Sequence, residues 1–168
     1  MELAELISSS EVIFSNNEIE TSIGEMAEKL NKTYRDQHVL VLPVLSGAIP
    51  FDGHLIPKLT FEVTINYFHA SRYAKNIGTD NIKLIYEPPD EAVKNRSILV
   101  LDDILDQGDT LAFIKQRLLV KGALEVSTAV LFDKAIGKSK PIQADYIGLD
   151  VPDIYVYGFG LDFNGIGR

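Results

Sequence analysis

The sequence has no cysteine and only three histidines among its 168 residues. Without cysteine, the chain cannot form disulfides, use a thiol nucleophile or build a zinc thiolate site. His38, His54 and His69 show no metal-ligand spacing, so we interpret all three as structural or surface residues. No arrangement of serine, histidine and acid indicates a hydrolase triad either.

Basic residues are outnumbered, and long apolar runs are missing. Lysine and arginine total 16 against 24 aspartates and glutamates, and the net charge of -8 disfavours nonspecific binding to nucleic acid or anionic membranes. No apolar run approaches the roughly 20 residues of a membrane span. The acidic start, MELAELISSSEVIF, is unlike a basic secretory signal. We therefore expect a cytoplasmic metabolic protein without nucleic-acid or membrane partners.

The sequence does contain enough apolar residues for one sizeable core. Hydrophobic residues make up 46% of the chain, and its length suits a single domain spanning residues 1–168. Apolar runs alternate with amphipathic stretches, which favours an α/β fold with a mostly parallel central sheet flanked by helices. We expect strands at residues 38–45, 62–68, 82–87, 97–103, 125–133, 144–150 and 154–159.

Helix signals occur at three places in the sequence. Ser22 followed by Glu25 is a capping-box pattern and predicts the start of a helix that continues with apolar residues at helical spacing. Pro50 suits the first turn of a second helix, which Pro57 should kink or end. A third helix begins near residue 110 and closes at Gly122.

Two turns leave strands at the carboxyl edge of the predicted sheet, where such folds bind ligands. One is the turn at residues 45–48, and the other ends the stretch ILVLDDILDQGDTL, residues 98–111, in which four aspartates fall just before a helix. One interpretation is an ordinary acidic turn with Asp109 or Thr110 as the helix cap. The other is an anion site, because free N–H groups and the helix dipole point there.

The complete pattern of residues 98–111 resembles the phosphoribosyl diphosphate (PRPP) signature of the type I phosphoribosyltransferases. By this resemblance Asp102 and Asp103 accept hydrogen bonds from the two ribose hydroxyls and hold metal-bound water, since carboxylates are pure acceptors. When pyrophosphate leaves, these carboxylates would stabilise positive charge on the sugar carbon. The next five residues would bind the 5-phosphate, mainly through backbone N–H groups: Asp106, Gln107, Gly108, Asp109 and Thr110.

Further segments narrow the resemblance to the hypoxanthine-guanine phosphoribosyltransferases, over about residues 19–168. Residues 45–48 are similar to the pyrophosphate turn of that family, and residues 71–73 to the start of its mobile lid loop. Residues 131–134 resemble its purine-selecting lysine segment, and residues 151–168 its base-binding C-terminal region. The implied fold adds a small hood, built from the terminal segments, to the type I phosphoribosyltransferase sheet.

The resemblance also implies a role for each matched residue. Asp106 would be the general base at purine N7, and Lys134 would donate to the 6-oxo group. Tyr155 would stack on the purine ring, and Val156 would meet the base edge through its backbone. Asp162 would lie at the purine and, with the acid pair Asp102 and Asp103, help hold Mg²⁺, the expected cofactor. Five further residues would bind PRPP or pyrophosphate: Ser46, Gly47, Arg72, Tyr73 and Arg168.

The sequence departs from the family pattern at several of these positions. Ser46 stands where a cationic or amide residue is common, and Ala48 where glycine is frequent, so backbone N–H groups must carry more of the pyrophosphate binding. Arg72 replaces a usual serine, and we hypothesise that it restores the missing charge when the lid closes. Gln107 and Asp109 are variants that the loop tolerates because it binds mainly through its backbone.

The resemblance implies a purine salvage enzyme that moves the 5-phosphoribosyl group from PRPP to N9 of a 6-oxopurine, namely hypoxanthine, guanine or, as an open case, xanthine. We expect a homodimer or homotetramer. One alternative is a PRPP-sensing regulator of the same fold that binds RNA, and the net charge of -8 counts against it. Another is a phosphoryl-transfer or receiver-type protein with Asp102 and Asp103 as a Mg²⁺ pair, but the glycine-rich lysine loop of nucleotide hydrolases is missing.

Overall fold

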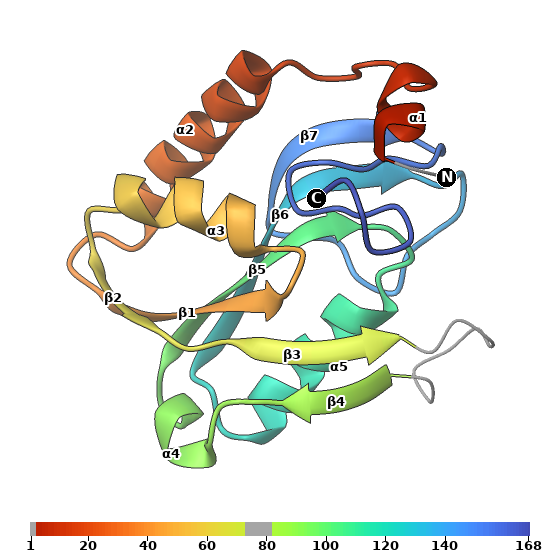
Figure 1. The fold of residues 1–168 in the computed structure, drawn as a ribbon. Helices are drawn as coiled ribbons and strands as arrows, with labels where there is room; N and C mark the ends of the chain where they lie inside the picture. The colour runs from red at the N-terminus through yellow and green to blue at the C-terminus, as the bar shows by residue number, and fades with distance from the viewer. Residues whose placement is uncertain (1–2, 73–81) are drawn as a thin grey trace.

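A seven-stranded sheet forms the centre of the computed structural model, which describes residues 3–72 and 82–168 (Figure 1). The strand order is β4-β3-β1-β5-β6-β7, and β2 also pairs with β1. All pairs are parallel except β3 with β4. The strands are β1 (His38–Leu45), β2 (Glu62–Ile65), β3 (Phe68–Arg72), β4 (Ile82–Tyr86), β5 (Ser97–Leu105), β6 (Glu125–Ala135) and β7 (Tyr146–Pro152).

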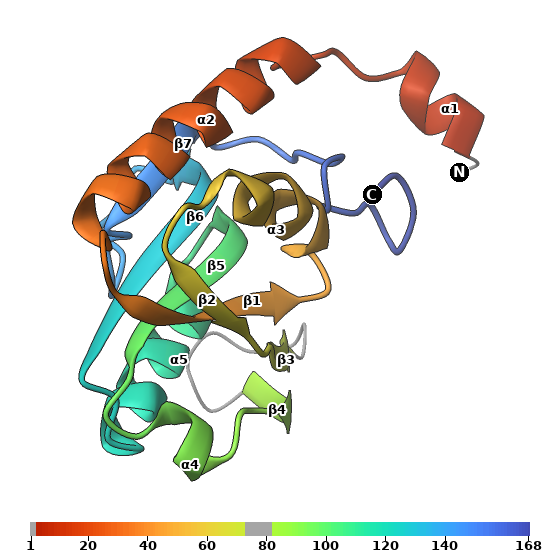
Figure 2. The same cartoon turned by 90° about the vertical axis from the view of Figure 1, so that its left-hand side faces the viewer.

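Helices cover both faces of this sheet, which confirms the predicted α/β fold. In Figures 1 and 2, α2 and α3 lie on one face, while α5 lies on the other. The described helices are α1 (Leu3–Ser8), α2 (Asn16–Thr33), α3 (Ile49–Leu55), the short 3-10 helix η1 (Ile56–Lys58), α4 (Asp90–Val93) and α5 (Asp109–Val120). None of the helices in the described ranges is long and apolar enough to cross a membrane.

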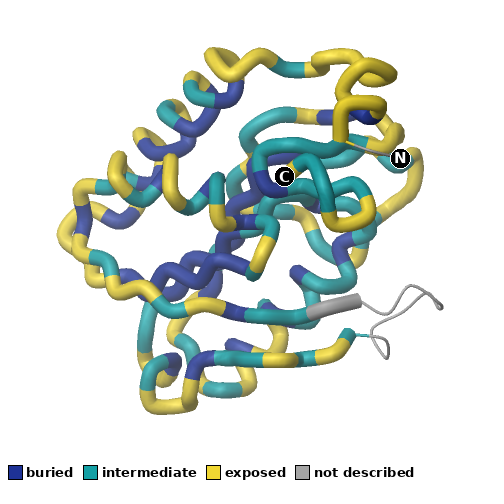
Figure 3. Tube along the Cα trace, in the orientation of Figure 1, coloured by how far each residue is buried: buried dark blue, intermediate teal, exposed yellow. Residues whose placement is uncertain are grey.

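The core consists of two layers because the central strands are buried on both faces (Figure 3). Side chains of β1 and β5 alternate between the layers: Val39 and Val41 face α2 and α3, whereas Leu40 and Leu42 face α5. This double burial explains why the strand at residues 38–45 reads as a continuous apolar run and is predicted with its observed bounds.

The first long helix starts earlier than the sequence pattern predicts. The observed capping box is Ser15 with Glu18, in which each residue's side chain accepts from the other's backbone N–H. The prediction that Ser22 and Glu25 form the box was wrong, because Ser22 lies inside α2 and is buried against the sheet. The pairs Ser15–Glu18 and Ser22–Glu25 have the same internal spacing and lie seven residues apart, about two helical turns. Spacing alone therefore does not tell which pair begins the helix.

Two strand predictions also need correction. The expected strand at residues 62–68 is divided between β2 and β3, which pair with different parts of β1. The expected strand at residues 154–159 is absent, and isolated bridges such as Gly158 with Leu161 take its place. Gly158, Phe159 and Gly160 all have positive φ, which an extended strand does not allow.

The two terminal segments lie together beside the carboxyl ends of the strands (Figure 1). The Tyr157 hydroxyl donates to the Leu6 carbonyl at 3.4 Å, and the Cδ2 atom of Leu6 packs against Gly167. These contacts join α1 to the segment that follows β7, which agrees with the predicted hood. The predicted lid loop falls largely on residues 73–81, outside the described residues.

Asp52 in α3 is a partly exposed acid whose Oδ1 atom is buried without a hydrogen-bond partner. Removal from water raises its pKa from 3.8 to about 6. The folded state therefore holds this proton more tightly than the unfolded state. The resulting contribution to stability is complete below about pH 4 and is lost as the pH rises through about 6.

Asp52→Asn is expected to raise the free energy of unfolding at about pH 8, by about 1 kcal/mol after a discount for solvent screening and for the helix dipole. At about pH 4 the change should be much smaller, because the native side chain is then largely neutral. Urea unfolding at both pH values measures the difference, with Glu91→Gln, at an exposed acid of α4, as the matched control. An equal effect of Asp52→Asn at both values would contradict this origin.

Candidate active site

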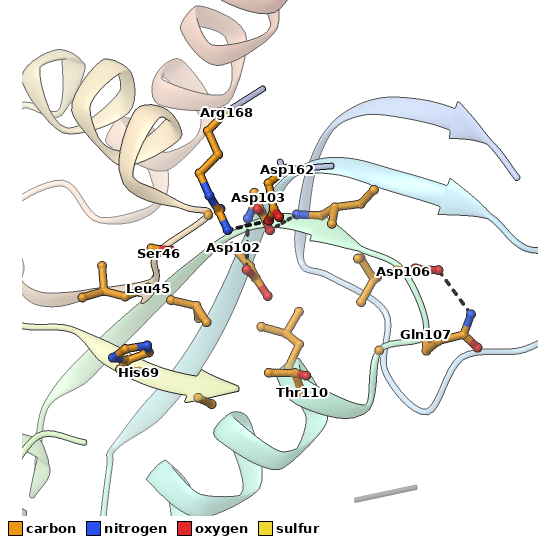
Figure 4. A pocket seen from close by; sticks show the side chains of 17 residues that line it. Leu45, Ser46, His69, Asp102, Asp103, Asp106, Gln107, Thr110, Asp162 and Arg168 are labelled. Atoms are coloured by element: carbon orange, nitrogen blue, oxygen red, sulfur yellow. Dashed lines mark hydrogen bonds and ion pairs between the residues drawn. The ribbon is translucent and has the colours of Figure 1, made fainter. Parts of the chain in front are cut away.

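A cavity of about 460 Å³ opens at the carboxyl ends of β1 and β5 (Figure 4). It lies where β1 and β5 pair as parallel neighbours and both lead into helices, the edge at which ligands bind in such sheets. Ten of the residues singled out from the sequence line it: Ser46, Gly47, Asp102, Asp103, Asp106, Gln107, Gly108, Thr110, Asp162 and Arg168.

Asp102 and Asp103, the acid pair near the end of β5, have the most strongly shifted pKa values in this cavity. The backbone N–H of Asp103 donates to Asp102 Oδ1 at 3.0 Å, and that of Ile104 donates to Asp103 Oδ1 at 2.8 Å. Removal from water raises the pKa of Asp102 well above its usual range, and the neighbouring Asp103 charge adds to this. Burial also raises the pKa of Asp103, while hydrogen bonds to its carboxylate and, to a smaller extent, the positive Arg168 act in the opposite direction. Such a pair favours a ligand that brings a cation or hydroxyl donors.

The turn between β1 and α3 lies directly against this acid pair. A side chain at Gly47 would overlap the Asp103 carboxylate, so only glycine fits there. The peptide bond between Leu45 and Ser46 is cis, and Ser46 is exposed at the cavity. A Cβ at Gly160 would in turn overlap the Gly47 carbonyl. The β1–α3 turn, the end of β5 and the C-terminal segment therefore meet in van der Waals contact.

The loop from Asp106 to Thr110 forms the opposite wall and leads into α5. Gly108 is the N-cap residue, with φ of 88°, a conformation that glycine adopts without strain. The alternative in which Asp109 or Thr110 is the N-cap was therefore wrong. Because Gly108 has no side-chain oxygen with which to cap the helix, the first turn of α5 presents backbone N–H groups to an anion. Asp106 and Gln107 are joined within the loop, since Gln107 Nε2 donates to Asp106 Oδ1 at 3.2 Å.

Asp162 and Arg168 form an ion pair that brings the C-terminal segment into the cavity (Figure 4). Arg168 Nη2 donates to Asp162 Oδ1, and Nη1 donates to the Gly160 carbonyl, both at 2.5 Å. Asp162 Oδ2 accepts from the Gly165 N–H at 2.6 Å. The carbonyl of Asp162 accepts from the Tyr155 hydroxyl at 2.9 Å. Arg168 is therefore held by Asp162 and Gly160, both in the C-terminal segment, and lies beside the acid pair Asp102 and Asp103.

Lys134 does not line the cavity itself but forms an ion pair with Asp106, which does. Its Nζ atom is 3.8 Å from Asp106 Oδ2, and the two side chains are 13% and 43% exposed. Tyr155, 64% exposed, makes an edge contact with the Phe163 ring and is tied to the cavity only through Asp162. Val156 is half-buried beside it and does not line the cavity. Of the predicted purine-binding residues, Asp162 lines the cavity, and Lys134 and Tyr155 each contact a residue that lines it.

The two remaining predictions of the PRPP-binding set concern the lid. Arg72 is the last residue of β3, and Tyr73 lies outside the described residues. The hypothesis that Arg72 compensates for Ser46 therefore stays a prediction. His69, which we interpreted as a structural or surface residue, is half-buried in β3 and lines the cavity. Its position follows from the register of Leu45 with His69, which no local sequence pattern reveals.

The described residues bring no three histidine or acidic side chains together as a ready-made metal site. Mg²⁺, the expected cofactor, is usually held by one or two carboxylates together with ligand oxygens and water. Asp102 and Asp103 fit that requirement, because they are neighbouring carboxylates that line the cavity. Burial raises the pKa of both, and a bound cation would stabilise their charged forms. Asp162 already uses both oxygens, on Arg168 and Gly165.

Comparison with known proteins gives a consistent result. A family model described as a phosphoribosyl transferase domain matches residues 9–164. The chain is 32% identical over 153 residues to a hypoxanthine-guanine phosphoribosyltransferase of Bacillus subtilis (strain 168), covering 90% of this chain and 84% of that protein. It is 31% identical to one from Streptococcus thermophilus (strain CNRZ 1066), with 91% and 85% covered.

Among solved structures, a hypoxanthine phosphoribosyltransferase from Staphylococcus aureus superposes with a TM-score of 0.88 at 25% identity, covering 99% of this chain and 92% of that one. The family model, the relatives and the shared fold all agree with the acid pair and glycine-capped loop at the carboxyl edge of the sheet. The chain belongs to the hypoxanthine-guanine phosphoribosyltransferase family and is a phosphoribosyltransferase enzyme.

Proposed function

We propose that the protein transfers the 5-phosphoribosyl group of PRPP to N9 of hypoxanthine or guanine, giving the nucleoside monophosphate and pyrophosphate. The observation that supports this proposal is one cavity lined by the acid pair, the loop of residues 106–110 and the glycine turn, with the Asp106–Lys134 pair beside it. The relatives named as hypoxanthine-guanine phosphoribosyltransferases support it. Xanthine is the third 6-oxopurine to test, and no observation favours the RNA-binding alternative.

The cavity wall around α5 would bind the ribose 5-phosphate end of PRPP. Backbone N–H groups from Gln107 to Thr110 would donate to the phosphate at the start of α5, where the helix dipole favours negative charge. Asp102 and Asp103 would accept from the 2- and 3-hydroxyls of the ribose. This division places the acids at the sugar and the backbone donors at the phosphate, so like charges do not meet.

The pyrophosphate group would lie between the Gly47 turn and the C-terminal segment. Because Gly47 has no side chain, the backbone of this turn can approach the diphosphate oxygens closely. Arg168 would supply the cationic contact from the opposite side, and Arg72 and Tyr73 would add to it from the lid. Bound Mg²⁺ would neutralise charge that develops on the leaving pyrophosphate. Asp102, Asp103 and Asp162 would help to hold it.

The purine would lie between the Asp106–Lys134 pair and Tyr155. Lys134 would donate to the 6-oxo group, while Asp106 would accept the proton from N7 as N9 forms its bond to the sugar carbon. The bond from that carbon to pyrophosphate breaks, and pyrophosphate leaves with the electron pair. Tyr155 would stack on the ring, and the Val156 backbone would meet the base edge. Fixed carboxylates near the sugar would stabilise its transient positive charge.

Two further expectations complete the proposal. A cytoplasmic location suits an enzyme that uses PRPP, a phosphorylated metabolite of the cell interior. A homodimer or homotetramer is the proposed assembly, and sedimentation of the purified protein tests it.

Binding of PRPP tests the proposed cavity directly. Titration calorimetry should show PRPP binding that strengthens with Mg²⁺, and the double variant Asp102→Asn/Asp103→Asn should weaken it about 10- to 100-fold, because two charge-assisted contacts to hydroxyls and metal-bound water are lost. The matched control is Glu91→Gln, an exposed acid of α4 that lies away from the cavity. PRPP binding that is unaffected by the double variant would contradict the assignment of the acid pair.

A further inference from the structure

Lys140, in the connection between β6 and β7, is a lysine that is removed from solvent at the end of the β5–β6 ladder. Its side chain is only 10% exposed. The Nζ atom donates to the carbonyl oxygen of Leu105 at 2.6 Å and also forms an ion pair with Asp133 Oδ1. Leu105 and Asp133 are register partners, the last pair between the two strands. One ammonium group therefore ties together the ends of β5 and β6.

The burial of the Lys140 ammonium group requires an explanation, because removing such a group from water costs free energy unless it is paired and hydrogen-bonded. Replacing such a pair with apolar side chains is often neutral or stabilising, so stability alone is a weak explanation for it. Lys138, an exposed lysine in the same connection, shows that the segment does not require burial of its cations.

The two residues that Lys140 contacts stand immediately before the two side chains proposed to recognise the purine. Asp106 follows Leu105, and Lys134 follows Asp133, and the side chains of these next residues lie 3.8 Å apart. A change in the distance between the strand ends would change the spacing of this pair by a similar amount. Each contact of Lys140 is therefore one residue away in sequence from a member of the Asp106–Lys134 pair.

Side-chain atoms of Lys140 and the two residues after it also pack against the loop of residues 106–110. A Cβ at Gly108 would lie 3.4 Å from Lys140 Cβ, 3.3 Å from Pro141 Cδ and 3.4 Å from Ile142 Cγ2. The same connection that ties the strand ends thus supports the loop that begins with Asp106. Gly108 and Thr110 are also held by α5, and Lys140→Met keeps the Cβ atom that packs at Gly108. Loss of the Nζ contacts should therefore affect Asp106 more than the phosphate-binding N–H groups.

We propose that Lys140 is a positioning residue that sets the spacing of Asp106 and Lys134 to match two neighbouring atoms of a 6-oxopurine, N7 and the 6-oxo oxygen. It touches neither substrate and acts through the Leu105 carbonyl and the Asp133 carboxylate. This inference rests on the proposed function, since the spacing matters only if that pair recognises the purine.

The test compares Lys140→Met with wild type in single-turnover nucleotide formation from hypoxanthine. A displacement of about 1 Å in a reacting group costs about 10²-fold, so we expect the rate to fall about 10- to 100-fold. The dissociation constant of PRPP should change less than about threefold, since its phosphate contacts remain. Lys138→Met, at an exposed lysine two residues away, is the matched control and should leave both quantities unchanged.

A second variant separates positioning from stability. Lys140→Met leaves the Asp133 charge without its partner, which destabilises the fold. The double variant Asp133→Asn/Lys140→Met removes that stranded charge and should restore the melting temperature, but the rate should stay low because Leu105 is still untethered. Recovery of the rate together with stability would overturn the proposal, as would a rate within about threefold of wild type in folded Lys140→Met. A wild-type protein that forms no nucleotide would contradict the proposed function itself, and this inference would fall with it.

Discussion

Asp106→Asn is expected to lower the single-turnover rate of nucleotide formation about 10²- to 10⁴-fold, the usual cost of losing a general base. Asparagine keeps the size of the side chain but does not accept the N7 proton at neutral pH. The structure adds a second reason, because Asp106 Oδ2 lies 3.8 Å from Lys134 Nζ and helps orient that ammonium group. Turnover should fall far more than PRPP binding, because the loop contacts the phosphate mainly through its backbone.

Rapid-quench measurement of the chemical step, with binding of PRPP measured separately, checks this expectation. Glu91→Gln, the same acid-to-amide change in α4 at the opposite end of the sheet, is the control and should behave as wild type (Figure 1). Near-wild-type chemistry in Asp106→Asn would reduce Asp106 to a loop residue. A loss of PRPP binding as large as the loss of rate would instead assign it to the phosphate site.

Adenine is expected to be turned over about 10⁴-fold less efficiently than hypoxanthine, the scale of discrimination that follows when buried polar groups are left mismatched. Lys134 offers only donors, and its side chain is 13% exposed beside Asp106. The 6-oxo group of hypoxanthine accepts from it, whereas the 6-amino group of adenine presents a donor to a donor. The Lys134 ammonium group is largely removed from water, so solvent offers little compensation.

Steady-state kcat/KM values for the two bases, with saturating PRPP, measure this discrimination. Lys134→Met should reduce it mainly by lowering kcat/KM for hypoxanthine, because the favourable contact is lost while adenine gains none. Adenine turnover within about tenfold of hypoxanthine in the wild type would remove Lys134 from purine selection.

Local sequence patterns predicted the parts of the fold that depend on local chemistry. The strand at residues 38–45 was predicted with its observed bounds, since burial on both faces leaves a continuous apolar run. The turn at Gly47 and the loop at Gly108 were predicted as ligand-binding turns because each follows a strand and precedes a helix. The structure places both of them at one cavity.

Features that depend on contacts distant in sequence were missed. His69 enters the cavity through strand register, and Lys140 reaches Leu105 across 35 positions of the chain. The false strand at residues 154–159 has a plausible apolar pattern, yet Phe159 and its flanking glycines have positive φ. In this conformation Gly160 packs against the Gly47 turn. No pattern within either segment encodes that contact.

The most direct test of the central claim is product formation from PRPP and hypoxanthine in the presence of Mg²⁺. Chromatography of the reaction should show inosine monophosphate and pyrophosphate appearing in equal amounts, with guanine giving guanosine monophosphate and xanthine assayed alongside. Omitting hypoxanthine should leave PRPP intact over the same period. Failure to form a purine nucleotide from any of the three bases, or hydrolysis of PRPP without transfer to the base, would contradict the account.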